Sequence, residues 1–338
     1  MFINRILDGL KHIHKPQLKF LTVLFTTIFV CQSRINFSSL ARNCHLNEKT
    51  FRRNFRKEFD FTRLNEAIIG QSKCQIGAFA MDASFIKKSG QETFGLDKFW
   101  NGCAGKAEKG LEASIISLVD IKENVSFALT VDQTEPNLAN RETVPEKKTR
   151  TDFYAEQLEK NAETILKYTR IGVFDGFYAK QKFVTRTVTA GFTMISRLRQ
   201  DANLKYLYTG AQKPTGRHRK YAGKVDFNDL SKCRESVVKI DNKEIHIYSA
   251  IIWSVSLARK IKLVVVRFKR KSVNFGREMA NPNQGESERK PFSMKSIKQQ
   301  FFNEHLLKLF ISKSGLEQSL IKYQETLEDL KNYAAIYS

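Results

Sequence analysis

Two aspartates are the residues best suited to chemistry, because each follows a short run of apolar residues. Asp82 ends the stretch IGAFAMD at 76–82, and Asp175 follows IGVF at 171–174. An ionised carboxylate beside an apolar strand costs free energy unless another charge compensates it. Two such carboxylates at adjacent strand ends would repel each other, and a divalent cation between them would remove the repulsion. Hard oxygen ligands suit Mg²⁺ or Mn²⁺, so we predict a metal site at these two aspartates.

A metal ion held by two carboxylates supports phosphodiester chemistry. It activates water or a 3′-hydroxyl for in-line attack and stabilises the leaving oxygen. The alternative is structural: Asp82 would cap a strand, and Asp175 would start a turn with Gly176. Either residue alone fits this alternative. The two together, in a chain with a formal net charge of +22, favour DNA cleavage or strand transfer.

The charge of the chain indicates the kind of partner. Its 338 residues include 57 Lys and Arg against 35 Asp and Glu, which gives a formal net charge of +22. So strong a positive charge favours a polyanion, and nucleic acid is the commonest polyanionic partner. An anionic membrane surface is the alternative. The hydrophobic fraction of 41% is that of an ordinary globular protein, in a chain long enough for two or three structural units.

The cysteines and the longest apolar stretch argue against other classes of protein. Five widely spaced cysteines without a CxxC pair disfavour a disulfide framework or a zinc site, and they fit a reducing cytosol. The apolar residues 20–30 fall short of the ~20 residues that span a bilayer. We therefore expect a buried helix there, in a soluble intracellular protein that has no membrane partner.

The N-terminal region 1–70 has a helical pattern. Residues 37–59 have the outline of a helix-turn-helix, which is a common DNA-binding motif. A serine at 38 or 39 would cap the first helix, and the basic second helix would end at Phe59.

The second of these helices has two different faces. Phe51, Phe55 and Phe59 recur every four residues, so we expect them to face the core together. The basic residues then point elsewhere, where they could contact phosphates or base edges. These residues are Arg52, Arg53, Arg56 and Lys57. The alternative is a solvated basic face on a small helical bundle.

Residues 71–204 alternate between strand and helix patterns, so the predicted fold class is α/β. Three strands, the last two joined in a hairpin, precede a helix, a fourth strand, a second helix and a fifth strand. This is the order of the ribonuclease H fold, and ligands of open α/β sheets gather at strand ends, where we expect both aspartates. The expected elements span residues 76–85, 111–120, 125–131, 152–168, 171–174, 178–189 and 192–196.

The rest of the chain has three predicted segments. Residues 205–267 have the pattern of a small β-rich insertion, 268–292 of a polar linker, and 293–338 of a helical tail. A basic and aromatic patch suited to phosphates lies in the insertion, beside Tyr221. Its basic residues are Arg217, Arg219 and Lys220.

Further residues are candidates for DNA contact. Tyr178, Lys180 and Lys182 follow the second aspartate and could touch the DNA backbone; the alternative is an ordinary surface helix. Trp100 lies, with Lys98, in the loop expected between the first two strands. Its indole could stack on an unpaired base, although core packing is the favoured role.

Several blocks of the sequence resemble one family and occur in that family's order. They are AMDASFIKKSGQETFGLDKFWNGCAGKAEKGLEASIISLVD, FDGFYAKQKFV and ISRLRQDANLKYLYTG. Together with the N-terminal NFSSLARNCHLNEKTFRRNFRK, they resemble the DDE transposases of bacterial insertion sequences, in the IS4-like group. The resemblance implies a ribonuclease H-like core in which Asp82 and Asp175 are the first two acids of a catalytic triad, with Mg²⁺ or Mn²⁺ as cofactor.

The resemblance also implies partners and a location. Such a protein acts on double-stranded DNA, at the element ends and at the target, and we expect a homodimer on that DNA. It would be a cytoplasmic, nucleoid-associated bacterial protein.

The third acid of the triad is not where the resemblance implies it. In this family it is a Glu within a Tyr-x2-Arg-x3-Glu-x6-Lys pattern on a helix, and residues 268–338 contain no such pattern. We interpret the difference as an internal deletion of that helix, and Glu304 is a weak substitute. Two hypotheses follow: a transposase with impaired activity, and an inactive remnant that only binds DNA.

Overall fold

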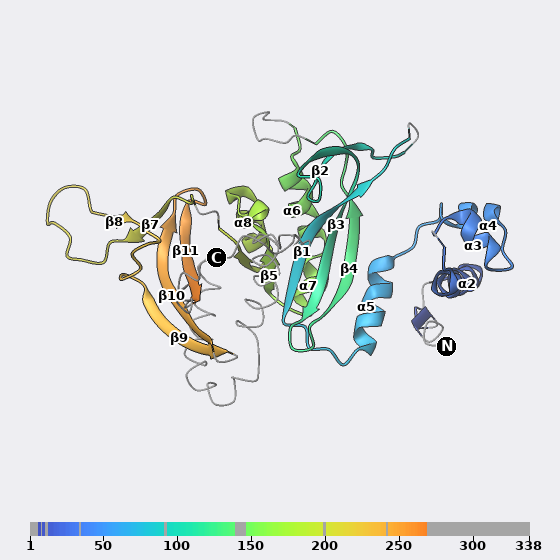
Figure 1. Cartoon of the computed structure of the whole chain (residues 1–338), viewed down its shortest axis with the longest axis horizontal. Coiled ribbons are helices and arrows are strands. Elements are labelled where there is room, and N and C mark those ends of the chain that lie inside the picture. Colours follow the sequence, from blue (N-terminus) through green and yellow to red (C-terminus); the bar gives the residue numbers. More distant parts are fainter. Residues whose placement is uncertain are drawn as a thin grey trace, which may run out of the picture. The chain divides into compact units, whose positions relative to one another are not determined.

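The computed structural model describes most of the chain up to residue 268 (Figure 1). The described residues are 6–7, 9–10, 13–33, 35–90, 93–138, 147–198, 201–240 and 243–268. Apart from residue 268, the predicted linker and helical tail, with Glu304, lie outside them. The chain forms two compact units: one takes residues from 1–76 and 81–134, and the other takes 77–80 and residues after 134.

Four helices form the N-terminal part of the first unit. They are α2 (Lys15–Val30), α3 (Phe37–Arg42), α4 (Glu48–Asn54) and α5 (Phe61–Gln71). The last three begin where the side chain of Asn36, Asn47 or Asp60 accepts a hydrogen bond from the backbone N–H three residues on. The cap of α3 is therefore Asn36, and the prediction of a serine cap was wrong. The predicted order of helix, turn and helix is present in α3 and α4, and its DNA-binding role stays a prediction.

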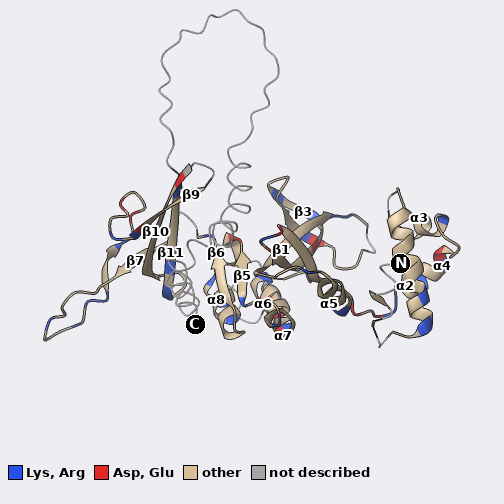
Figure 2. Cartoon of the chain, turned by 90° about the horizontal axis from the view of Figure 1, so that it is seen from below, with Lys and Arg blue, Asp and Glu red and all other residues tan. Residues whose placement is uncertain are grey.

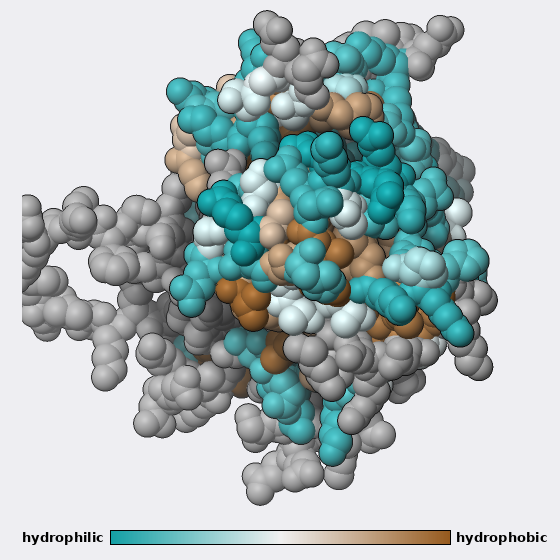
Figure 3. Space-filling model, turned by 90° about the vertical axis from the view of Figure 1, so that its right-hand side faces the viewer, coloured by the Kyte–Doolittle hydropathy of each residue, from teal (hydrophilic) through white to brown (hydrophobic). Residues whose placement is uncertain are grey.

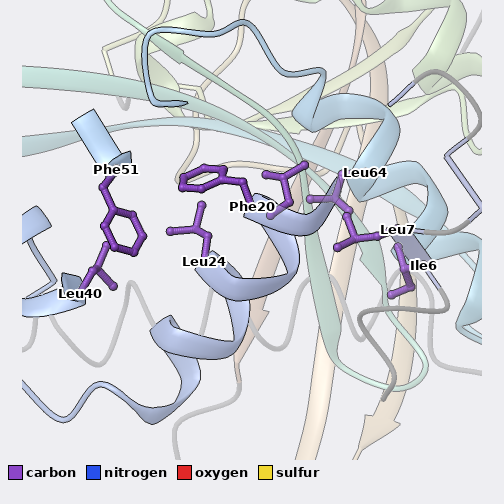
Figure 4. Close-up of a cluster of buried hydrophobic side chains, with 8 residues drawn as sticks. Ile6, Leu7, Phe20, Leu24, Leu40, Phe51 and Leu64 are labelled. Atoms are coloured by element: carbon purple, nitrogen blue, oxygen red, sulfur yellow. The ribbon is translucent and has the colours of Figure 1, made fainter. Parts of the chain in front are cut away.

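These helices share one apolar core (Figure 4). Its buried members are Ile6, Leu7, Phe20, Leu21, Leu24, Leu40, Phe51 and Leu64. The prediction that α4 would extend to Phe59 was wrong, because the chain leaves the helix after Asn54 to reach the cap of α5. Phe51 is buried as expected, but Phe55, at the end of α4, is 54% exposed.

The same N-terminal region also leaves large apolar side chains in contact with solvent. The exposed ones are Phe29, Val30, Ile35, Phe55 and Phe61. The face that Figure 3 shows carries apolar patches between hydrophilic side chains. Single exposed apolar residues are common on proteins, so this surface alone indicates no partner.

A mixed six-stranded sheet carries both aspartates. Its strands are β1 (Ala78–Lys87), β2 (Asp97–Asn101), β3 (Lys106–Asp120), β4 (Val125–Gln133), β5 (Ile171–Phe174) and β6 (Thr193–Ser196). The order is β2-β3-β1-β5-β6, and β4 also pairs with β3. The strands β1, β5 and β6 run parallel, whereas β2, β3 and β4 pair antiparallel. This arrangement is consistent with the predicted ribonuclease H-like fold. The sheet also contains β2, where the sequence predicted a loop.

Helices of the second unit follow and separate the parallel strands. They are α6 (Arg150–Lys160), α7 (Ala162–Leu166), the short 3₁₀ helix η1 (Gly176–Tyr178) and α8 (Gln181–Thr189). The helix expected at 152–168 is thus divided at Asn161. Thr149 and Asp152 form a reciprocal capping box at the start of α6, which explains why the helix begins there.

A second sheet occupies the predicted β-rich insertion. Its strands are β7 (Leu204–Leu207), β8 (Tyr221–Lys224), β9 (Arg234–Ile240), β10 (Lys243–Ser254) and β11 (Arg259–Phe268). They pair antiparallel in the order β11-β10-β7-β8, with β9 also paired to β10. The β character expected for 205–267 is therefore confirmed.

Two further expectations concern the described residues. All five cysteines lie among them as free thiols. Within this part of the chain, none of the helices has both the length and the apolarity needed to cross a bilayer.

Candidate functional site

Asp82 lies in the middle of β1 with its side chain exposed. Phe79 and Met81 are buried, and Asp82 is the first residue of this strand whose side chain is exposed. Its Oδ1 accepts a hydrogen bond of 2.8 Å from the backbone N–H of Ala83. The expectation that Asp82 lies at a strand end was wrong, because β1 continues for five residues beyond it, to Lys87. The predicted strand ended at Phe85, and the structure extends it by Ile86 and Lys87, which are both exposed.

Asp175 directly follows β5, as predicted, and is exposed. Its Oδ1 accepts a hydrogen bond of 2.8 Å from the backbone N–H of Phe177 and so caps η1. This hydrogen bond closes a turn at Gly176, which is the structural role that the sequence offered as the alternative to metal binding.

The register of β1 and β5 relates the positions of the two aspartates along their strands. The parallel pairs are Phe79 with Gly172 and Ala80 with Val173. A Cβ added at Gly172 would lie 2.5 Å from the ring of Phe79, so the absence of a side chain permits this packing. Asp82 and Asp175 each lie two residues beyond the second pair.

The donors available for a metal ion are carboxylates. Mg²⁺ is commonly bound through one or two carboxylates together with water and substrate phosphates, so Asp82 and Asp175 have suitable chemistry. In the described part of the chain, no group of three or more His, Cys, Asp or Glu side chains is placed to hold a metal.

The residues after Asp175 are used largely for packing. Tyr178 is only 2% exposed, and its ring packs between those of Tyr154, Phe174 and Phe183. Neither of the two roles that the sequence left open for Tyr178, a DNA contact or a surface helix, fits a side chain so deeply buried. Aromatic side chains bury large areas in cores, and the ring of Tyr178 does so here.

Two lysines near α8 contact other protein groups. Lys180 donates from Nζ to Oγ1 of Thr151 at 3.2 Å and lies 3.9 Å from the ring centre of Phe177. Lys182 forms an ion pair of 2.6 Å with Asp152. A DNA contact by Lys180 stays a prediction, and it would compete with these contacts.

A network of charges between α6 and α8 was not predicted from the sequence. Asp152 is buried and contacts both Lys182 and Arg186, and Arg186 also pairs with Glu159. Burial raises the pKa of Asp152, but hydrogen bonds from Lys182 and Thr149 outweigh it and hold the pKa at about 2. The capping-box spacing from Thr149 to Asp152 was the signal that could have located this carboxylate.

The basic residues near α4 differ in their surroundings. Arg52 pairs with Glu48 at 2.5 Å and lies 5.2 Å from the ring centre of Phe37. The other three predicted DNA contacts, Arg53, Arg56 and Lys57, are exposed. Contact between these residues and DNA stays a prediction.

The basic patch of the second unit lies on the loop between β7 and β8. Figure 2 shows Lys and Arg along this loop. The three predicted residues, Arg217, Arg219 and Lys220, are all exposed. Arg219 also contacts other parts of the loop: its guanidinium lies 4.8 Å from the ring centre of Tyr208, and its backbone N–H donates to Gln212 at 2.9 Å.

The favoured expectation that Trp100 packs in the core was wrong. It belongs to β2 rather than to a loop, and its side chain is 60% exposed rather than packed in the core. The adjacent Phe99 is buried instead, so the alternation of the strand decides which aromatic ring faces inward.

A comparison with protein-family models gives a match over residues 10–251 to the family described as DDE superfamily endonuclease. No curated protein matches the chain. The family match extends from the N-terminal helices through both predicted acids and into the second sheet. The chain therefore belongs to the DDE superfamily endonucleases.

Proposed function

We propose that the chain is a DNA transposase of an insertion sequence, of the IS4-like group. Its site would be formed by Asp82 and Asp175, which would hold Mg²⁺ or Mn²⁺. The observation that carries this proposal is the equal offset of the two aspartates from the paired residues of β1 and β5. Family membership supports the same chemistry, because a DDE endonuclease acts on DNA phosphodiesters.

The roles of the chain's own residues follow from their chemistry. Each aspartate would supply carboxylate oxygens. The hydrogen bond that each carboxylate accepts from a backbone N–H orients its side chain. When bound, the metal would activate water or a 3′-hydroxyl and stabilise the leaving oxygen. Exposed arginines and lysines would neutralise phosphates and hold the DNA in position.

The partner in this proposal is double-stranded DNA, at the element ends and at the target, bound by a homodimer. The exposed basic residues near α4 and on the β7–β8 loop support binding to a polyanion. A cytoplasmic, nucleoid-associated protein of a bacterium would fit this partner.

A second function is favoured by one sequence observation. The third-acid pattern does not occur in residues 268–338. A chain that lacks this acid would bind DNA ends without cutting them, since loss of one member of a cooperative site typically lowers the rate by orders of magnitude. This inactive remnant and an impaired transposase differ in cleavage but share DNA binding.

The metal site is tested by isothermal titration of the purified chain with Mn²⁺. We expect binding to be lost in Asp82→Asn and in Asp175→Asn. Asp226→Asn is a matched control, because Asp226 also accepts a backbone N–H two residues on, at 2.8 Å. Equal Mn²⁺ affinity in all variants would contradict the proposed site.

Cleavage is tested by nicking of a supercoiled plasmid with Mn²⁺. Nicking that both active-site variants abolish, and that Asp226→Asn retains, would support an active transposase. Duplex binding without nicking would support the remnant. A chain that neither binds duplex DNA nor nicks it would contradict both functions.

A further inference from the structure

The pairing of β1 with β5 is short. It comprises two residue pairs, Phe79 with Gly172 and Ala80 with Val173. A parallel ladder of this length supplies few hydrogen bonds to fix one register, and a slip by one residue turns every side chain of a strand to the opposite face. Contacts outside the ladder are therefore needed to fix the register, and two such contacts are present among the described residues.

The first contact is made by the hydroxyl of Thr169, which lies between α7 and β5. Its Oγ1 donates to the backbone carbonyl of Gly77 at 3.1 Å and accepts from the backbone N–H of Ile171, also at 3.1 Å. Gly77 directly precedes β1, and Ile171 is the first residue of β5. One hydroxyl therefore joins the starts of the two strands.

The backbone around Thr169 is itself anchored. Its N–H donates to the carbonyl of Ile165 at 3.0 Å, and Ile165 is a fully buried residue of α7. The next residue, Arg170, accepts at its carbonyl from the backbone N–H of Thr193, the first residue of β6, at 2.8 Å. Because this backbone is held from both sides, the hydroxyl of Thr169 determines where Gly77 lies along β5.

The second contact is the packing of Phe79 on Gly172. The ring of Phe79 is fully buried, and its centre lies 5.6 Å from the ring centre of Phe174 and 4.9 Å from that of Phe192. A Cβ at position 172 would lie 2.5 Å from the ring of Phe79, so only glycine leaves room for it. A slip by two residues would place a residue with a side chain opposite Phe79. This packing and the Thr169 hydroxyl therefore favour the same register.

We propose that Thr169 is a positioning residue, whose hydroxyl fixes the register of β1 against β5 and thereby the equal offset of Asp82 and Asp175. The inference rests on the proposed function for the role of the two aspartates. A slip by one residue shifts a parallel strand by about 3.3 Å, which would break the hydrogen bond between Thr169 and Gly77. It would also turn the side chain of Asp82 to the opposite face of the sheet. The hydroxyl thus maintains the offset that a shared metal site requires.

Thr169→Val tests this role, because it removes the hydroxyl and retains a branched side chain, whereas Thr169→Ser retains the hydroxyl. Loss of one hydrogen bond corresponds to about threefold to tenfold in an equilibrium constant. By isothermal titration we expect Thr169→Val to weaken Mn²⁺ binding by this factor with an unchanged number of sites, and Thr169→Ser to bind like the parent. A role in stability alone would lower the number of competent sites and leave the affinity unchanged.

Thr27→Val is the matched control for the loss of a threonine hydroxyl. The Thr27 hydroxyl also donates to a backbone carbonyl, that of Val23 within α2, at 2.7 Å. This bond lies outside the two strands, so we expect Thr27→Val to retain the Mn²⁺ affinity of the parent. An equal loss of affinity in Thr27→Val and Thr169→Val would contradict a specific role of Thr169.

Hydrogen exchange, measured by mass spectrometry on the full chain without metal, tests the register independently of Mn²⁺. The amides of residues 78–81 and 171–174 should exchange about threefold to tenfold faster in Thr169→Val than in the parent. Thr169→Ser and Thr27→Val should leave these amides unchanged. Equal exchange of both segments in the parent and in Thr169→Val would refute the inference.

The outcome is distinguishable from that of the proposed function. If neither Asp82→Asn nor Asp175→Asn changed the Mn²⁺ affinity, the proposed metal site would fail, and the exchange rates alone would decide whether Thr169 fixes the register. If both aspartate variants lost Mn²⁺ binding while Thr169→Val kept the affinity of the parent, the metal site would stand and the positioning role of Thr169 would be wrong.

Discussion

Asp152 binds two basic side chains of α8, and replacing it with asparagine gives a quantitative test of this packing. Its Oδ1 lies 2.6 Å from Nζ of Lys182 and 3.4 Å from a guanidinium nitrogen of Arg186. Its Oδ2 accepts from the backbone and the hydroxyl of Thr149 at 3.0 and 2.7 Å. The carboxylate is buried, so solvent screens these interactions little. We expect Asp152→Asn to destabilise the second unit at neutral pH.

The magnitude follows from the pKa of Asp152. The folded protein holds this pKa at about 2, against an ordinary value of 3.8. At 1.36 kcal/mol per pKa unit, ionisation stabilises the fold by about 2 kcal/mol at pH 7. Because the folded pKa is the lower one, this contribution is present above about pH 4 and is lost as the pH falls towards 2. At pH 3 about half of it remains.

Urea unfolding at pH 7 and pH 3, followed by circular dichroism, measures this effect. The parent chain should lose about 1 kcal/mol more than Asp152→Asn between the two pH values. Glu156→Gln is a control on the same helix, because Glu156 makes a half-exposed ion pair of 2.7 Å with Lys148 and should contribute less than about 1 kcal/mol. An equal pH dependence in the parent and in Asp152→Asn would refute the reasoning.

Further predictions concern packing and DNA contact. Tyr178→Ala should destabilise the chain by about 3–5 kcal/mol in urea unfolding, since its ring is buried among aromatic side chains; a loss below about 1 kcal/mol would contradict that packing. Gly110→Ala should cost about 1–3 kcal/mol, because the added Cβ would lie 2.6 Å from a backbone carbonyl oxygen of β1. Gly102→Ala, with nothing within 4 Å of its Cβ, is the matched control, and equal stability of the two variants would count against this contact. Replacing Arg217 and Lys220 together by alanine should lower the salt slope of duplex binding by about 1.8, as measured by anisotropy; an unchanged slope would remove the loop from the DNA interface.

Much of the sheet could be predicted from local sequence. Strand β5 matches the predicted residues 171–174, and β4 begins at Val125 as expected, because both combine β-branched residues with clear turn signals. Strand β2 could not be predicted in this way. Its five residues include Asp97, Lys98 and Asn101, and they form a strand because β3 provides the paired edge. That tertiary pairing decides that Phe99 faces inward and its neighbour faces solvent.

The predicted end of α4 was wrong for a related reason. Phe51, Phe55 and Phe59 have the spacing of one helix face, but the side chain of Asp60 caps a new helix one residue later. The cap competes with continuation of α4, and the chain has to leave the helix in order to present it. Periodicity describes which residues could share a face, whereas capping bonds decide where the helix ends.

Asp175 shows why structural and chemical interpretations of one residue need not compete. Sequence alone offered a turn or a metal ligand, and the structure shows the turn, with Oδ1 accepting from the backbone of Phe177. A carboxylate has about four acceptor positions on two oxygens, so one hydrogen bond leaves capacity for a cation. The turn fixes the direction of the side chain at the end of β5, and such pre-orientation strengthens a ligand. The structural role therefore supports the proposed catalytic role. Asp226 accepts the same kind of backbone hydrogen bond, so comparing Mn²⁺ affinity in Asp226→Asn and Asp175→Asn tests whether the location of Asp175 matters for metal binding.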